Sequence, residues 1–221
     1  LPDTYELWND LNIWKDQNDG IPLIKKKKSL YNDIVNRTDE SKYASIPGFV
    51  KNKDNKVGMI RRQCTKHYKI DVVDKEIRNL HSLKFRQRMK PTEIWLGISI
   101  DEIQRMKIST RYNIEYIYPL IEKRINRSQC ASLLEEFGFF NIKKSSCVFC
   151  PYKNNSQWKE LKIKYPDEWK KVLLVDEKIR KGIESVKPDV FLHQSCEPMS
   201  DVDLQENQEE LFMCEEGYCG V

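Results

Sequence analysis

Hydrophobic residues recur at intervals of three and four in some stretches of the chain and at intervals of two in others. The first pattern is typical of helices and the second of strands. Near the start, Thr4 can cap a helix that runs to about Asn18 and ends at Gly20. Residues 21–25, IPLIK, are expected to form a short strand, and Ser29 is expected to start a second helix.

Two further strands are predicted at 92–99 and 114–120, and residues 38–58 are expected to form a long loop. Ser99 and Glu102 have the spacing of a capping box that opens a helix through about residue 108. Other helices are predicted at about 72–88, 126–138, 154–165 and 166–181. Asn126 and Gln129 resemble a second capping box, and Pro166 suits the first position of the last helix. Because strands alternate with helices, we expect an α/β fold with a mostly parallel sheet.

The pattern weakens after residue 187, which suggests three parts. Residues 1–140 are expected to form the α/β domain, 141–186 a turn with a helical segment, and 187–221 a linker with a cysteine-containing tail. About three strands are visible, which is few for such a fold, and the chain opens on Leu1 rather than Met. We therefore expect an upstream segment that carries the first strand.

The composition adds limits on function. The chain has 221 residues, 39% of them hydrophobic and 33% charged, and its net charge of +4 is weak for an obligate nucleic-acid binder. Apolar runs such as VLLV at 172–175 are far shorter than a membrane span, and no signal region opens the chain, so a cytoplasmic protein is expected. The lysine run 25–28 is expected to be a solvated face, whereas segment 61–69 surrounds a cysteine and a histidine and is a candidate anion site.

Seven cysteines without a secretory signal favour reduced thiols that bind metal or perform redox chemistry. Cys147 and Cys150 are spaced so that one turn can direct both thiolates to one metal ion, either zinc or an iron–sulfur cluster. A redox pair is less favoured, because Pro151 delays the following helix. Cys130 and Cys196 are expected to be structural, whereas Cys64 lies in a basic segment that favours a thiolate.

Several segments resemble the phosphoadenosine-phosphosulfate (PAPS) reductase-like family of the adenine nucleotide α-hydrolase-like, or PP-loop, superfamily. The segment RRQCTKHYKID at 61–71 matches one family motif at Cys64 and Lys69, and WLGISIDEIQRM at 95–106 matches another. The opening helix and the strand-to-helix unit at 118–138 are also similar to the family. The resemblance implies a three-layer α/β fold with a helical, cysteine-bearing C-terminal extension. The sequence departs from the family in several respects. Asp71 and Val72 stand where a proline is often seen, Ser99 replaces a frequent arginine, Gln63-Cys64 supplies one cysteine where the reductases often have two, and no histidine follows Cys219-Gly220. The phosphate-binding loop S-G-G-x-D-S is also absent, so an upstream segment or a partner would have to supply it.

The resemblance also implies a function and a site. The expected activity is sulfur transfer or reduction on an adenylated, nucleotide or nucleic-acid substrate, with a [4Fe–4S] cluster. The residues implied are Cys64, Cys147, Cys150 and Cys214 as metal ligands, Arg61, Arg62, Lys69 and Arg105 for phosphate or sulfate groups, and Cys219 as the catalytic thiolate.

An alternative is a zinc-stapled module that binds nucleic acid without catalysis. The local basic runs support it, but no aromatic stacking platform is evident in the sequence. The metal present, zinc or iron, would separate the two hypotheses.

Overall fold

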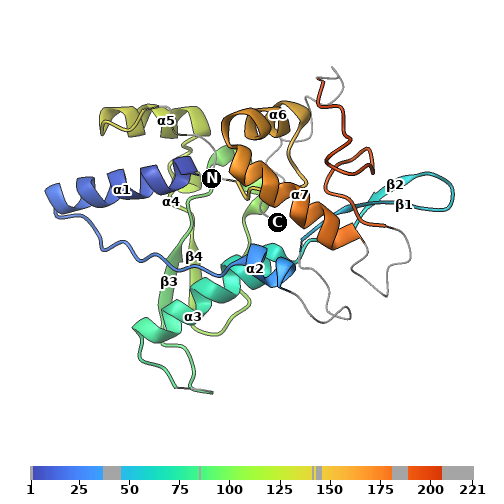
Figure 1. The fold of residues 1–221 in the computed structure, drawn as a ribbon. Helices are drawn as coiled ribbons and strands as arrows, with labels where there is room; N and C mark the ends of the chain where they lie inside the picture. Colours follow the sequence, from blue (N-terminus) through green and yellow to red (C-terminus); the bar gives the residue numbers. More distant parts are fainter. Residues whose placement is uncertain are drawn as a thin grey trace. The chain divides into compact units, whose positions relative to one another are not determined.

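The structure is a computed structural model that describes residues 2–36, 46–84, 86–140, 142, 146–180 and 189–205 (Figure 1). It is a mixed α/β fold with two small sheets, which confirms the predicted class at this level. The α-helices are α1 (Pro2–Gln17), α2 (Leu30–Val35), α3 (Asp71–Leu80), α4 (Pro119–Glu122), α5 (Arg127–Glu136), α6 (Asn155–Lys164) and α7 (Pro166–Arg180). The remaining elements are the π-helix η1 (Lys66–Ile70), the 3-10 helix η2 (Ile100–Arg105) and strands β1 (Phe49–Lys51), β2 (Val57–Met59), β3 (Thr92–Trp95) and β4 (Ile114–Ile117).

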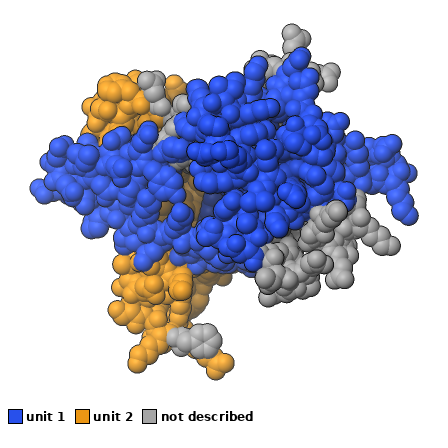
Figure 2. All heavy atoms as spheres, in the orientation of Figure 1, with its two compact units in different colours: residues 1–72, 145–219 blue, residues 73–144, 220–221 orange. Residues whose placement is uncertain are grey.

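The chain divides into two compact units, shown in different colours in Figure 2. Unit 1 takes its described residues from Leu1–Val72 and Ser145–Cys219, and unit 2 takes them from Val73–Lys144. Within the described ranges, no helix combines the length and the hydrophobicity that a membrane-spanning helix requires.

The hydrophobic core of unit 1 lies between helices α2, α6 and α7 and the segment 189–205. Trp158, Val172 and Leu192 have no exposed surface, and Trp158 and Trp169 pack edge to face with ring centroids 6.3 Å apart. Helix α6 forms where expected because Asn154 and Gln157 make a reciprocal capping box at its start. These contacts bring residues far apart in the sequence into one core.

Asp176 of α7 fixes the segment 189–205 against this core. Its carboxylate is almost fully buried and accepts hydrogen bonds from the backbone N–H groups of Leu192 (3.0 Å) and Met199 (3.1 Å). Arg180, one turn further along α7, forms an ion pair with the same carboxylate. A buried carboxylate with this many partners is a strong constraint on the path of the chain.

The antiparallel hairpin β1–β2 also joins the segment 189–205. The backbone N–H of Phe49 donates to the Phe191 carbonyl at 2.7 Å, and the Phe191 N–H donates back at 2.9 Å. Gly48 permits this approach, because a Cβ atom there would lie 2.3 Å from a methyl carbon of Val190. The hairpin thus depends on a glycine at its base.

Unit 2 is built on the parallel pair β3–β4, in which Thr92 lies opposite Ile114 and Trp95 opposite Ile117. Helix α5 follows, with the predicted capping box at Asn126 present. The carboxylate of Asp101 also accepts a hydrogen bond from the first N–H of this helix at 2.6 Å. Asp101 is therefore a helix-capping residue in this structure.

Several local predictions are wrong. The helix predicted at about 72–88 ends at Leu80, and the strands predicted at 92–99 and 114–120 end at Trp95 and Ile117. Residues 21–25 form neither helix nor strand, and Ile21 is 85% exposed, because no neighbouring strand pairs with them. The capping box at Ser99 does not form: the Ser99 hydroxyl donates to Asp101, and Glu102 instead pairs with Arg105. The helix there is a 3-10 helix that ends at Arg105.

The predicted loop at 38–58 contains the hairpin β1–β2 in its described part. Its turn is stabilised by the side chain of Asn52, which accepts hydrogen bonds from the backbone N–H groups of Asp54 and Lys56. The strands are only three residues long, which is too short for a clear alternating pattern in the sequence.

Candidate functional site

The Cys147-x-x-Cys150 motif forms a tight turn directly before α6. The N–H of Cys150 donates to the Cys147 carbonyl at 3.2 Å, and the N–H of Lys153 donates to the Cys150 carbonyl at 3.2 Å. Phe149 between them is buried in the core of unit 1 and contacts Tyr31, with ring centroids 6.4 Å apart. A buried aromatic side chain therefore anchors a turn whose cysteines lie near the surface.

Cys64 lies at the edge of the same core, immediately before the π-helix η1. The hydroxyl of Tyr68 in this helix donates to the carboxylate of Asp33 in α2 at 2.6 Å. Burial, the hydrogen bond to Asp33 and the nearby negative charge raise the pKa of Tyr68 well above its usual value, so the hydroxyl stays protonated. This bond attaches the segment that carries Cys64 to the body of unit 1.

The structure brings Cys64 and the cysteine turn together. Burial raises the pKa of the Cys147 thiol, and the nearby Cys64 raises it further, whereas a hydrogen bond from the Phe149 backbone and the positive charges of Lys153 and Lys69 lower it. We call Cys64, Lys69, Cys147 and Lys153 the thiol–lysine cluster.

Two further contacts involve Lys153 of the cluster and the residues beside its cysteines. The ammonium of Lys153 donates to the Ser146 hydroxyl at 2.5 Å. The guanidinium of Arg62 lies 5.5 Å from the ring centroid of Tyr152. The anion-site segment 61–69 and the cysteine turn are therefore neighbours.

Thiolates beside ammonium groups can bind a soft metal or act as nucleophiles, and the ammonium groups can hold an oxyanion. Within the part of the chain that the structure describes, no group of three or more His, Cys, Asp or Glu side chains is placed to bind a metal ion. Cys214 and Cys219 lie outside the described residues. The cluster has the chemistry of a thiolate metal site but, in the described residues, not a converged set of three donors.

Other predicted site residues are placed elsewhere. Arg105 belongs to unit 2, where it forms an ion pair with Glu102 at 2.7 Å. Arg61 lies on the exposed surface of unit 1, three positions before Cys64. Cys130 is half-buried in α5 of unit 2, and Cys196 is buried in unit 1, where burial raises its pKa.

Sequence reasoning missed a buried polar network next to the cysteine turn. The side-chain oxygen of Asn155, the first residue of α6, lies 2.8 Å from His193 Nε2, and its nitrogen donates to the Gln205 carbonyl at 2.8 Å. The N–H of Ser195 donates to His193 Nδ1 at 3.1 Å, so the ring proton lies on Nε2. These contacts span 38 and 50 positions, so no local pattern could reveal them.

Lys153 was also missed, although it could have been found. It stands three positions after Cys150, in the same short turn as the two cysteines. A basic residue this close in sequence to a cysteine pair brings its positive charge near enough to influence the pKa of the thiols.

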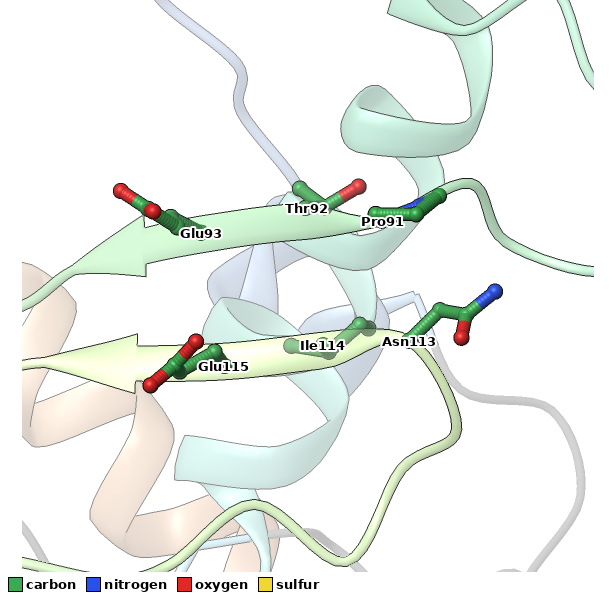
Figure 3. Close-up of a pocket in the computed structure, with 6 residues that line it drawn as sticks. All are labelled: Pro91, Thr92, Glu93, Asn113, Ile114 and Glu115. Carbon is green, nitrogen blue, oxygen red and sulfur yellow. The ribbon is translucent and has the colours of Figure 1, made fainter.

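Two cavities among the described residues are large enough to be candidate binding sites. One of about 560 Å³ lies against β3 and β4 and is lined by Pro91, Thr92, Glu93, Asn113, Ile114 and Glu115 (Figure 3). The register places Glu93 opposite Glu115, so two carboxylates face any ligand there and an anionic substrate is disfavoured.

The second cavity, of about 460 Å³, lies in unit 1 and is lined by residues of α1 and α7 and by Val148. Val148 stands between Cys147 and Cys150, so this cavity adjoins the cysteine turn. Lys171 on its wall donates to Glu168 at 2.6 Å, and this bond raises the pKa of Lys171. The cavity is large enough for a small organic ligand.

Comparisons with known proteins found no family model that matches this sequence, no similar curated protein and no similar solved structure.

Proposed function

We propose that this chain is a PAPS reductase-like protein that transfers or reduces sulfur on an adenylated or other nucleotide substrate. The observation that carries the proposal is that the segment of Cys64 and the cysteine turn, far apart in the sequence, are neighbours in unit 1. Cys64 and Val148 pack against the same core, and the guanidinium of Arg62 lies 5.5 Å from the ring centroid of Tyr152. The three-layer fold of the family and the upstream or partner-supplied phosphate-binding loop are parts of the same proposal. The parallel pair β3–β4 supports it.

The residues of the cluster suit this chemistry. Lys69, together with Arg61 and Arg62 in the same segment, would hold the phosphate or sulfate oxygens of the substrate, because cationic donors form strong hydrogen bonds with oxyanions. Arg105, which the resemblance also implies, belongs to unit 2, where it pairs with Glu102, and is not part of this unit 1 site. On an adenylated sulfate, the Cys219 thiolate would attack the sulfur and expel the adenosine phosphate, which leaves an S-sulfocysteine. A second thiol, supplied by an external dithiol reductant, would then release sulfite and form a disulfide with Cys219.

The proposed cofactor is a [4Fe–4S] cluster held by Cys64, Cys147, Cys150 and Cys214. Such a cluster would supply electron-transfer capacity or a charged centre near the substrate. The bond between Asn155 and Gln205 places the last described residues beside the start of α6, five positions after Cys150. Cys214 stands nine positions after Gln205 in the sequence, outside the described residues.

Metal analysis of the full chain tests this proposal. After anaerobic purification, we expect iron and sulfide together with an absorption band at about 400 nm. Cys64→Ser, Cys147→Ser and Cys150→Ser should each lose both signals, whereas Cys130→Ser in unit 2 is the matched control and should retain them. Cys214→Ser tests the fourth ligand.

Two outcomes would count against it. Stoichiometric zinc without iron would overturn the cluster and favour the zinc-stapled module. If the Cys147→Ser and Cys130→Ser chains released sulfite or transferred sulfur from an adenylated sulfate at equal rates, the thiol–lysine cluster would have no part in the chemistry.

A further inference from the structure

The lysine run 25–28 does not form an isolated solvated face. The ammonium of Lys25 lies 4.4 Å from the ring centroid of Tyr5 and 5.4 Å from that of Trp8, both in α1. The ammonium of Lys27 lies 6.0 Å from the Tyr5 centroid. At these distances the cations are attracted to the ring faces, so lysines and aromatic rings share one surface of unit 1.

The same surface continues toward Cys64. The ammonium of Lys28 lies 4.4 Å from the ring centroid of Tyr68 in η1 and 3.5 Å from the carbonyl oxygen of His67. Arg62, two positions before Cys64, lies over Tyr152, as described above. Four rings from three parts of unit 1, namely α1, η1 and the cysteine turn, thus each have a cation beside them. Two of these pairs belong to the segments that form the thiol–lysine cluster.

The surface is accessible at the lysine run and Tyr5, whereas Trp8, Tyr68 and Tyr152 are half-buried. All four lysines of the run are exposed, and Tyr5 keeps 47% of its surface exposed with Lys25 beside it. Residues 21–28 form neither helix nor strand, and the run 25–28 spans about 10 Å of extended chain. The run therefore reaches from the rings of α1 to the ring of η1.

Rings with adjacent cations match the two repeating parts of a nucleic-acid strand. Bases stack on aromatic side chains, and phosphates pair with lysine and arginine. Stacking of this kind requires unpaired bases, which excludes the interior of a duplex. Several ring–cation pairs on one surface exceed what a single mononucleotide can contact.

We propose that Tyr5, Trp8, Tyr68 and Tyr152, with Lys25, Lys27, Lys28 and Arg62, form a binding surface for single-stranded nucleic acid. The surface leads a strand toward the thiol–lysine cluster. The role of that strand as the sulfur acceptor rests on the proposed function, whereas binding itself does not.

The test compares two triple variants of equal charge. K25A/K27A/K28A removes three lysines of the surface, and K51A/K53A/K56A removes three exposed lysines of the β1–β2 hairpin as a matched control. Binding is measured by fluorescence anisotropy with labelled RNA and DNA single strands of about 12 nucleotides. Circular dichroism confirms that each variant is folded.

We expect the surface variant to lose affinity at least about tenfold, because three phosphate contacts are lost. For the same reason, the slope of log K against log[salt] should become shallower by about 2. The hairpin variant should change affinity by less than about threefold, as screened distant charges do. Tyr5→Leu should weaken binding by about tenfold at unchanged salt dependence, because it removes stacking and leaves the charges in place.

Three outcomes would overturn the proposal. Equal losses in the two triple variants would indicate non-specific attraction, and duplexes that bind as tightly as single strands would exclude stacking. Polyglutamate that competes as well as the single strand would indicate an acidic protein partner. If Cys147→Ser binds strands normally while the chain shows no thiol-dependent chemistry, the proposed function fails and the binding surface stands.

Discussion

Trp158 in α6 and Trp95 in β3 are both tryptophans, but one lies in a buried core and the other on an exposed surface. Trp158 has no exposed surface, whereas Trp95 is 68% exposed and donates a hydrogen bond to Glu93 at 3.2 Å. The units around them differ in the same way. The core cluster lies in unit 1, and among the residues that the structure describes, those buried in unit 2 are Ser99, Ile114 and Tyr118.

This difference indicates where the free energy of folding comes from. Unit 1 closes its core with segments from both ends of the chain, so apolar burial dominates its stability. Unit 2 depends on a two-stranded parallel sheet, and parallel sheets are ordinarily covered on both faces. Its described residues are instead linked by polar contacts, such as the ion pair between Arg111 and Asp74. The two units should therefore respond differently to equivalent substitutions.

The largest effect is expected for Trp158→Ala, which should lower the free energy of unfolding by about 3 to 5 kcal/mol. The substitution removes a fully buried ring and leaves a cavity. Trp95→Ala is the matched control and should change the free energy by less than about 1 kcal/mol. Chemical denaturation followed by circular dichroism measures both, and equal losses would contradict the contrast between the units.

A second large effect is expected for Asp176→Ala, at about 3 kcal/mol. The substitution leaves the N–H groups of Leu192 and Met199 without their acceptor and Arg180 without its ion pair. Limited proteolysis should then cut within 189–205. Asp167→Ala on the same helix removes an exposed pair with Lys170 and should leave stability and cleavage unchanged; early cleavage there too would argue against a specific role for Asp176.

Local patterns predicted much of this fold. The capping box at Asn126 and the proline at the start of α7 were predicted, and the capping box at Asn154 was not, although its helix was; all three signals involve residues within one or two turns of each other. Their helices therefore begin where the sequence indicates. The strand expected at 21–25 failed for the opposite reason, since a strand needs a partner and no local pattern specifies one.

The candidate site was only partly predictable. Cys64, Cys147 and Cys150 could be chosen from their spacing and their basic surroundings. The rings of Tyr5 and Trp8 could not be linked to the lysine run, because they stand about 20 positions away on another element and meet it only in the fold. The same holds for Asn155 and His193, which are 38 positions apart.

A moderate and local effect is expected for Arg111→Ala in unit 2. Arg111 pairs with Asp74 of α3 and donates to the hydroxyl of Tyr116 in β4 at 3.2 Å, and the pair with Asp74 helps to raise its pKa against the opposing effect of burial. Removing it should cost about 1 kcal/mol. Hydrogen exchange measured by mass spectrometry should accelerate in α3 and β4 and stay unchanged in α6 and α7. Uniform acceleration would show that the two units unfold together.

The smallest effect is expected on the reactivity of the Cys147 thiol in unit 1, which is compared with the reactivity of Cys130 in unit 2. Cys147 is an exposed residue, but the protein around its sulfur partly desolvates the thiol and raises its pKa, so less thiolate exists at neutral pH than for a free cysteine. The positive charge of Lys153 lowers that pKa. Lys153→Ala should therefore move the midpoint of the pH-dependent alkylation of Cys147 upward and slow the reaction at neutral pH, and Lys153→Arg should preserve it. Peptide-resolved mass spectrometry measures this rate against Cys130 of unit 2 as an internal reference. A midpoint that moves downward in Lys153→Ala, or a shift of equal size at Cys130, would show that Lys153 does not act on the thiol–lysine cluster.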